Sequence, residues 1–355
     1  MADTTISRTS PRGLVGNCPM EVATPQGAVS VGGMLTAARE RVVAATNDLF
    51  SHGPYPLADT LKYPGDQGLF GPGSMTWQVV GDTAVLVGGI RALLVQAAHP
   101  EVVAGVAEHS LYREDPLGRL SRTSSYVTAT SFGAMPEVER AVAIVRKAHR
   151  PVVGLSHRGL PYDAADPALA AWVHNSTTDS FLTAFRIFGS RACSEDDADR
   201  FVAEQARVGA LLDADPLPES ARELSAWIAD HPALGRSPDT RETIGFLRKP
   251  PLPVPAGIGY RLLFYAAVAT LPRRICEVLG VRALPGDAAV GRATVSALRW
   301  SLGASPSWRL ALIRSGAEPP PGVRFRQPLP RGTALPEPPA RLVEIPATKG
   351  RAATP

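Results

Sequence analysis

The stretch DPALAAWVHNSTTDSFLTAF, residues 166–185, decides the fold class of this chain. Asp166 belongs to the residue types that cap helix N-termini, and Pro167 is favoured at the first helical position. Apolar side chains then recur at the spacing of one helix face, at Leu169, Trp172, Val173, Phe181, Leu182 and Phe185. The pattern predicts a long amphipathic helix that begins at Asp166.

Similar starts recur on both sides of this stretch. Helix-initiating residues with apolar residues behind them occur near Met34, Asp82, Pro100, Asp115-Pro116, Pro136-Glu137, Ser194, Ser220 and Ala289. Clear alternating strands and internal repeats are absent from the sequence. We therefore expect an all-α fold with a single large helical domain over residues 34–316.

The two ends of the chain differ in composition from the part between them. Residues 1–33 are rich in Ser, Thr, Pro and Gly, which predicts a flexible N-terminal segment. Residues 317–355 contain Pro319-Pro320-Pro321 and Pro338-Pro339, so we expect an irregular Pro-rich C-terminal tail. The ordinary interpretation of this tail is a solvated segment, which we favour over a ligand for a partner domain.

Charge, cysteines and hydropathy narrow the function classes. The net charge of +4 is spread along the chain, and neither a long run of one charge nor an RNA-binding motif is present, so no nucleic-acid partner is expected. Cys18, Cys193 and Cys276 are odd in number and far apart, which indicates free thiols and a cytoplasmic location. The apolar segments 84–98 and 262–271 are interpreted as core helices rather than membrane spans, although a peripheral membrane contact stays open.

The common catalytic motifs are absent. The sequence holds no HExxH pair, GxSxG elbow, P-loop or dinucleotide fingerprint in the required context. Most of the remaining residues that could bind a ligand or take part in catalysis lie between Gln96 and Asp179.

Arg119, Arg122 and Thr123 share one helix face in this segment, and Tyr126 continues that face one turn later. Two interpretations stay open for the arginines. They bind an anion such as a haem propionate or a substrate carboxylate, or they pair locally with the carboxylates of Glu114, Asp115 and Glu137.

Two histidines of the same segment are further candidates. His149 lies near the end of the next expected helix, on a small apolar face, where an imidazole can ligate iron or act as an ordinary core histidine. His174 follows Trp172 in the long helix and can line the same cavity or serve packing. For His99 and His109 we expect roles at helix ends.

A series of motifs in this part of the chain resembles the haem oxygenases grouped with MpaB and the latex clearing proteins. The motifs follow one another in order and are Gln96–Pro100, His109-Ser110, Asp115–Arg119, Arg119–Tyr126, His149–Gly154, Tyr162–Pro167 and Trp172–His174. The resemblance covers residues 77–186, with a weaker match at Leu271–Arg274. Each motif alone is weak, whereas their order and spacing together are specific.

The resemblance implies a helical protein with a haem b pocket between its helices and His149 as the metal ligand. It implies that Arg119 and Thr123 form the polar pair near the haem that supports stability and activity. Arg122 stands where latex clearing proteins can place a lysine that reaches the iron. Because arginine stays protonated, this departure suggests an open distal side. Tyr126 and His174 are added as further cofactor-binding candidates.

The leading functional hypothesis is a haem b-dependent oxygenase that activates O₂ to oxidise or cleave a small lipophilic substrate of isoprenoid or lipid-like character. The alternative is a non-catalytic helical protein that binds haem or lipid as a sensor or carrier. A third possibility is another enzyme class on the same scaffold without haem. The sequence leaves the substrate and the oligomeric state open.

Overall fold

The computed structural model describes residues 31–50, 52–330 and 333. The chain divides into two compact units, Met1–Ala38 and Arg39–Pro355. The first unit is described from Val31 onward, where it forms the beginning of α1. The helices of the described residues are, in chain order, α1 (Val31–Phe50), η1 (Thr60–Lys62), α2 (Met75–Gly81), α3 (Val85–Gln96), α4 (Pro100–His109), α5 (Pro116–Phe132), α6 (Met135–His149), α7 (Pro167–Phe188), α8 (Glu195–Ala210), α9 (Ala221–Asp230), α10 (Pro238–Arg248), α11 (Val254–Val268), α12 (Arg273–Leu279), α13 (Asp287–Leu302) and α14 (Pro306–Ser315).

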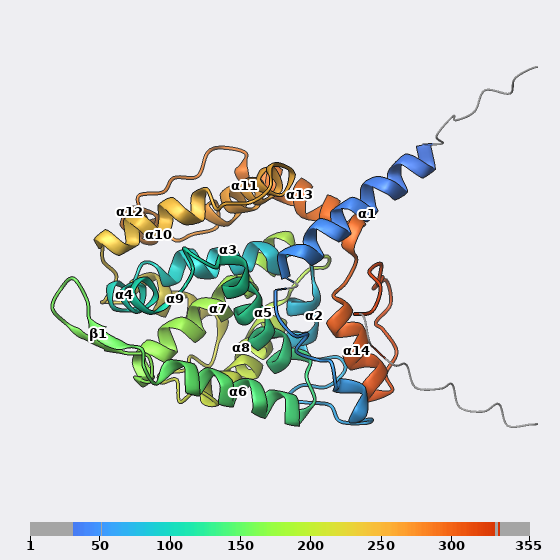
Figure 1. The fold of residues 1–355 in the computed structure, drawn as a ribbon, viewed down its shortest axis with the longest axis horizontal. Coiled ribbons are helices and arrows are strands. Elements are labelled where there is room, and N and C mark those ends of the chain that lie inside the picture. Colours follow the sequence, from blue (N-terminus) through green and yellow to red (C-terminus); the bar gives the residue numbers. More distant parts are fainter. Residues whose placement is uncertain (1–30, 51, 331–332, 334–355) are drawn as a thin grey trace, which may run out of the picture. The chain divides into compact units, whose positions relative to one another are not determined.

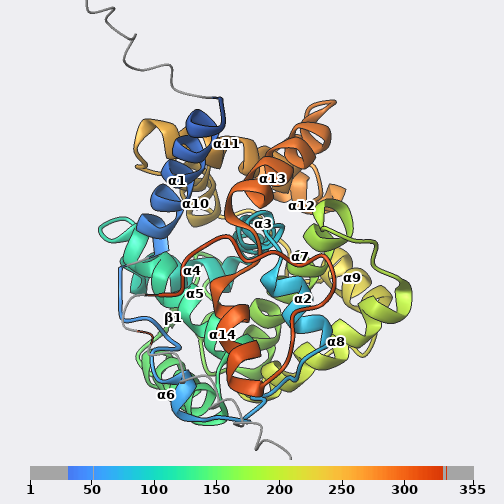
Figure 2. The same ribbon diagram turned by 90° about the vertical axis from the view of Figure 1, so that its right-hand side faces the viewer.

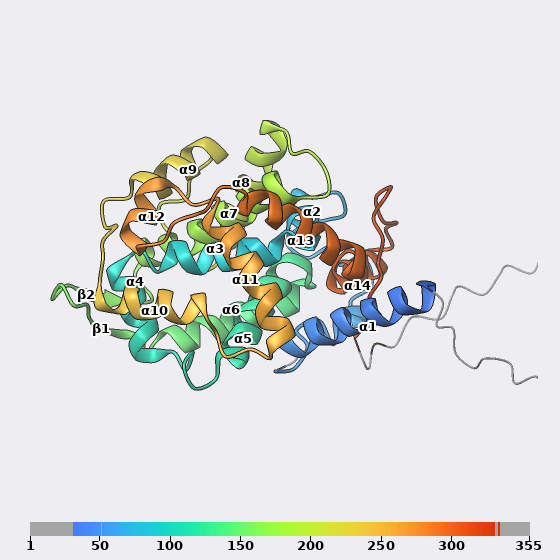
Figure 3. The same ribbon diagram turned by 90° about the horizontal axis from the view of Figure 1, so that it is seen from above.

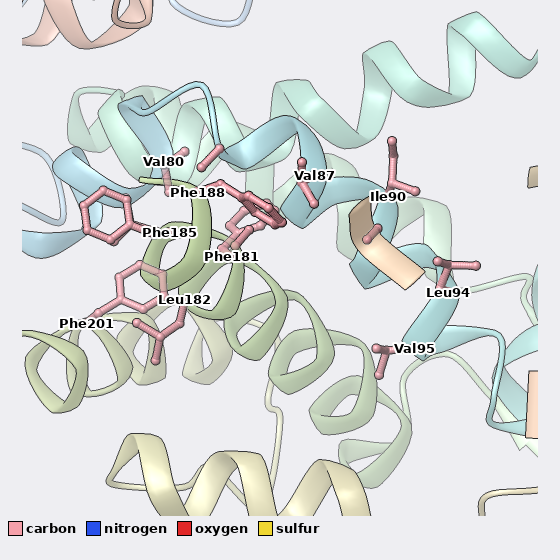
Figure 4. Packing of buried hydrophobic residues seen from close by; sticks show 14 of the residues in the cluster. Val80, Val87, Ile90, Leu94, Val95, Phe181, Leu182, Phe185, Phe188 and Phe201 are labelled. Carbon is pink, nitrogen blue, oxygen red and sulfur yellow. The ribbon is translucent and has the colours of Figure 1, made fainter. Parts of the chain in front are cut away.

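The centre of the larger unit is the contact between α3 and α7. Figure 4 shows buried apolar side chains of both helices, with Val87 of α3 beside Phe181 of α7. A Cβ atom added at Gly88 would lie 2.8 Å from the Phe181 ring and 3.1 Å from its Cα, so this glycine sets how closely the two backbones approach. Burial of these side chains makes α3 and α7 the core of the fold.

A buried ion pair links the same two helices. The Arg91 Nη1 atom lies 2.6 Å from Asp179 Oδ2, and both side chains are almost completely buried. Arg91 also donates to the hydroxyl of Ser180, and the Ser225 hydroxyl of α9 donates to Asp179. The charge inside the apolar segment 84–98 is therefore compensated within the core rather than exposed.

The other helices of the larger unit form layers around this pair. Helices α10 to α13 lie along one side of α3, with α11 packed on both α3 and α13 (Figure 1; Figure 3). Helices α8 and α9 pack on α7, and α5 and α6 pack on each other. Helix α14 contacts α2 and α5 (Figure 2).

The expected all-α class is confirmed, and the main helix starts lie where the capping residues placed them. Asp166 accepts hydrogen bonds from the amides of Ala168 and Leu169, and Ser194 accepts one from Asp197. The sequence did not predict the small antiparallel hairpin of β1 (Val153–Leu155) and β2 (Pro161–Asp163). Strands of three residues are too short to display an alternating pattern.

The described part of the Pro-rich segment returns to the helical domain. Phe325 forms an isolated bridge with Gly303, and Val323, Phe325 and Leu329 pack against the apolar core. Residues 1–30, 331–332 and 334–355 of the two expected tails lie outside the described residues. The expected domain boundaries at residues 33 and 316 stay predictions.

None of the described helices is long and apolar enough to cross a membrane by itself. Helices α2 and α3 reach that length and composition only as a pair, which is bent by 91° at the break between them.

Candidate functional site

Helices α5 and α6 bring most of the predicted site residues together. They pack on each other as a helical hairpin whose connection is the pair Gly133-Ala134. Arg119 on α5 and His149 at the end of α6 each lie roughly 20 Å along their helix axes from this connection. The two residues are therefore about equally far from the connection, each measured along its own helix.

Local hydrogen bonds determine where this hairpin begins and turns. The Asp115 carboxylate accepts a hydrogen bond from the Gly118 amide at 2.9 Å and so caps α5, and Pro116 occupies the first helical position. The buried Glu137 carboxylate accepts from the Ala134 amide at 2.9 Å at the start of α6. The α5–α6 hairpin thus rests on sequence-local capping interactions.

Arg119 has neutral partners. Its Nη1 donates to the Ser110 hydroxyl at 2.5 Å, and its guanidinium carbon lies 5.9 Å from the centre of the Tyr112 ring. Burial lowers the pKa of this guanidinium. Among the described residues no carboxylate lies within ion-pair distance of Arg119. The local ionic network that the sequence allowed is therefore not formed by this arginine.

Arg122 is engaged differently, although it lies only one turn away. Its Nη1 lies 3.2 Å from Asp115 Oδ2, and the arginine side chain is 61% exposed. The Gly118 amide and the Arg122 guanidinium hold the pKa of Asp115 below its ordinary value. For Arg122 the local ion pair, which was the alternative interpretation of the sequence, is the arrangement found.

The two remaining α5 candidates differ in burial. Thr123 is exposed. Tyr126 is partly buried, and its hydroxyl oxygen is fully buried without a hydrogen-bond partner among the described groups. Burial raises the pKa of Tyr126 to about 12, so the phenol is protonated at neutral pH and can donate a hydrogen bond. A buried hydroxyl of this kind calls for an additional hydrogen-bonding partner.

His149 is the last residue of α6 and is partly buried. Burial lowers the pKa of its imidazole, although a hydrogen bond with the backbone of Ala164 acts in the opposite direction. The ring is therefore neutral at pH 7, the form that binds metals.

His174 lies between α7 and α8. Its Nε2 is 3.4 Å from the Thr178 hydroxyl, and a Cβ atom at Gly209 would lie 2.8 Å from its Cδ2. Burial lowers the pKa of His174 to about 4, while the backbone of Gln205 raises it. These contacts are those of a neutral packing histidine, and no described contact joins His174 to the α5 candidates.

Sequence reasoning did not single out two buried hydroxyls, that of Tyr112 beside Arg119 and that of Thr243 on α10. Tyr112 and Thr243 are both more than nine-tenths buried, and their side-chain oxygens have no hydrogen-bond partner among the described groups. The Tyr112 ring packs edge-on against Phe246, which lies one turn after Thr243 on α10. The only signal in the sequence was the close spacing of Tyr112 and Arg119. The packing of Phe246 on Tyr112 could not be predicted, because α10 is distant in sequence.

The described residues contain no group of three or more His, Cys, Asp or Glu side chains that could hold a metal ion. Haem is a group that supplies an iron with four ring nitrogens and needs one further ligand from the protein. The residue types of the α5–α6 hairpin fit such a group, because His149 is a neutral imidazole and Arg119 is a guanidinium without a carboxylate partner.

Comparison with protein families places the chain among oxygenases. Residues 77–300 match the family described as ER-bound oxygenase mpaB/B'/Rubber oxygenase, catalytic domain. Because this match covers more than half of the 355 residues, the protein belongs to that family. The searches of curated proteins and of solved structures returned no match.

The family match confirms the resemblance found in the sequence and extends it through α13 to Trp300. It supports an enzyme of the oxygenase type, a class that uses dioxygen and an organic substrate. All of the predicted site residues lie inside the matched segment.

Proposed function

We propose that this protein is a haem b-dependent oxygenase that acts on a small lipophilic substrate. The observation that carries the proposal is Arg119, a partly buried cation without a carboxylate partner, on the helix that packs against the helix of the neutral His149. A buried positive charge is costly unless an anion compensates it, and the propionates of haem are such anions. The family match supports the oxygenase class independently.

Four residues of the α5–α6 hairpin have a role in this proposal. In this proposal His149 holds the iron through one ring nitrogen. The imidazole also interacts with the backbone of Ala164. Arg119 binds a propionate, and Tyr126 and Thr123 provide hydroxyls beside the cofactor. Arg122 and His174 have other partners in the fold, namely Asp115 and the α8 backbone. Their roles at the cofactor stay predictions from the sequence and are not part of this proposal.

When bound, haem b supplies the iron that activates dioxygen. His149 would hold the iron, and the Arg119 guanidinium would supply the charge that anchors the cofactor. The lipophilic substrate class and the cytoplasmic location are part of the proposal and rest on the sequence.

The test starts from the purified full-length chain reconstituted with haem. We expect a Soret absorption band that His149→Ala abolishes or strongly weakens. His157→Ala is the matched control, since His157 is an exposed histidine of the β1–β2 hairpin and should leave the band unchanged. Far-UV circular dichroism checks that both variants keep their helices.

Two results would contradict the proposal. A wild-type protein without a Soret band after reconstitution would exclude haem, and a His149→Ala protein with full haem occupancy would exclude that ligand. Oxygen consumption with isoprenoid alkenes and unsaturated lipids then separates the enzyme from a carrier. A haem-loaded protein that consumes no oxygen with any of them would favour the non-catalytic alternative.

A further inference from the structure

The positive charge of the protein is concentrated in one helical layer. Between Arg241 and Trp300 the sequence contains nine Arg and Lys residues but only three Asp and Glu residues. The whole chain carries +4, so the remainder of the chain is slightly negative. This segment comprises most of α10 and all of α11 and α12, and it reaches almost to the end of α13 (Figure 1).

Helix α11 has apolar residues on two faces. Leu263, Phe264 and Ala267 are buried in the core, and α11 packs on α3. A second stripe at i, i+4 and i+8 is exposed: Val254 is 76% exposed, Ile258 60% and Leu262 38%. A helix that is apolar beyond its core-facing side has a face that lacks a partner.

Exposed basic residues accompany this second stripe. Arg261 follows Ile258 by three residues and therefore lies beside it on the helix surface. Arg248, the last residue of α10, and Lys249 are exposed in the segment that leads to α11. None of these three side chains forms an ion pair with another described residue, so their charges are available to an external anion.

Helix α13 packs on α11 and carries exposed apolar residues of its own. A Cβ atom at Gly291 would lie 2.5 Å from the Cβ of Ala266, so the two helices touch at this buried point. Val290, which precedes Gly291, is 47% exposed. Along the same α13 face, Ala293 and Ala297 are exposed and Trp300 is 45% exposed. We call the exposed residues of these two helices, namely Val254, Ile258, Arg261, Leu262, Val290, Ala293, Ala297 and Trp300, the α11–α13 face.

We propose that the α11–α13 face docks the protein onto an anionic lipid surface. Apolar side chains that enter the headgroup region, a tryptophan at its boundary and surrounding Arg and Lys residues are the elements of peripheral membrane binding. The excess of positive charge in this layer complements anionic headgroups. This inference is independent of the proposed haem chemistry, and it places the protein where lipophilic molecules concentrate.

The test is co-sedimentation of the full chain with vesicles of phosphatidylcholine alone and of phosphatidylcholine with phosphatidylserine. We expect binding to the anionic vesicles that weakens as salt is added. The double variant Val254→Asp/Ile258→Asp should reduce partitioning by about tenfold or more, because two apolar contacts become repulsive charges. Ile144→Asp is the matched control, since Ile144 on α6 is 62% exposed outside this face and should bind like the wild type.

Three outcomes would overturn the proposal. The first is a wild type that does not bind anionic vesicles, and the second is an equal loss of binding in Ile144→Asp and in the double variant. The third is a dimer in light scattering that the double variant converts to a monomer without any vesicle binding, which would assign the face to a second copy of the chain. Ile258→Ser serves as a milder variant if circular dichroism shows that the double variant has lost helix.

Discussion

Arg119 and Arg122 are chemically identical residues one helical turn apart, and their surroundings give them different roles. Arg122 is exposed beside a carboxylate, whereas Arg119 is partly buried between the Ser110 hydroxyl and the Tyr112 ring. A charge without a counter-charge destabilises the unoccupied protein and favours the binding of an anion. Stability and ligand affinity should therefore respond in opposite directions at this residue.

Replacing Arg119 by methionine tests this opposition. We expect Arg119→Met to stabilise the haem-free protein by about 1 kcal/mol, because an uncompensated charge is removed from a partly buried position. The same change should weaken haem binding by about tenfold, since a charge-assisted contact to a propionate is lost. Urea unfolding and titration followed at the Soret band measure the two effects.

Arg122→Met is the control for this prediction. Its ion pair with Asp115 is exposed, so both quantities should change by less than about 0.5 kcal/mol. If both variants weakened haem binding equally, the special role of Arg119 would be refuted.

At the scale of elements, two neighbouring glycines of α3 have opposite surroundings, and only Gly88 lies in the contact with α7. Gly88 faces Phe181 and the Ser180 carbonyl oxygen, and an added Cβ would lie 2.8 to 3.2 Å from their atoms. Gly89 has no such neighbour within 4 Å. Alanine raises helix propensity at both positions, so the difference between them isolates the packing contribution.

We expect Gly88→Ala to destabilise the protein by roughly 1–2 kcal/mol, because backbone atoms of α7 must move away. Gly89→Ala should instead stabilise it by up to about 1 kcal/mol, since it gains helix propensity without a clash. Urea unfolding followed by circular dichroism provides both values. Equal effects of the two substitutions would mean that the α3–α7 contact is not tight at Gly88.

At the scale of the whole molecule, buried histidines connect folding to pH. His99 is 5% exposed and packs between the rings of Trp172 and His231, with its Nδ1 3.4 Å from a Glu101 carboxylate oxygen. Burial lowers its pKa from 6.5 to about 4, although Glu101 acts in the opposite direction. Between these two pH values the unfolded chain binds the proton that the folded protein excludes.

The sign of the pH dependence follows from that difference. The contribution of neutral His99 is complete above pH 6.5 and is lost as the pH falls toward 4, by up to about 3 kcal/mol. We expect His99→Phe to flatten the decrease of unfolding free energy between pH 6.5 and 4 relative to the wild type. His157→Gln, which changes an exposed histidine, should retain the wild-type decrease. A wild-type slope in His99→Phe would contradict the assignment.

The sequence by itself determined the helical class, most helix starts and the family. Asp115-Pro116, Asp166-Pro167 and Ser194 set helix starts because a cap bonds to an amide two or three residues away, so the signal is local. The candidate site residues on α5 and α6 could also be predicted from the sequence, since a short connection keeps the two helices next to each other. The hairpin of β1 and β2 could not be predicted, because strands of three residues are too short to show an alternation of apolar and polar residues.

Only the tertiary structure decided which of the two arginines lies next to a carboxylate and that the Tyr112 hydroxyl beside Arg119 is buried. The surroundings of Tyr112 depend on Phe246 of α10, more than a hundred residues further along the chain. The exposure of the second apolar face of α11 could not be predicted from the sequence either, because it too depends on remote helices. A sequence pattern records that a residue is apolar, whereas its exposure depends on how remote helices pack against it.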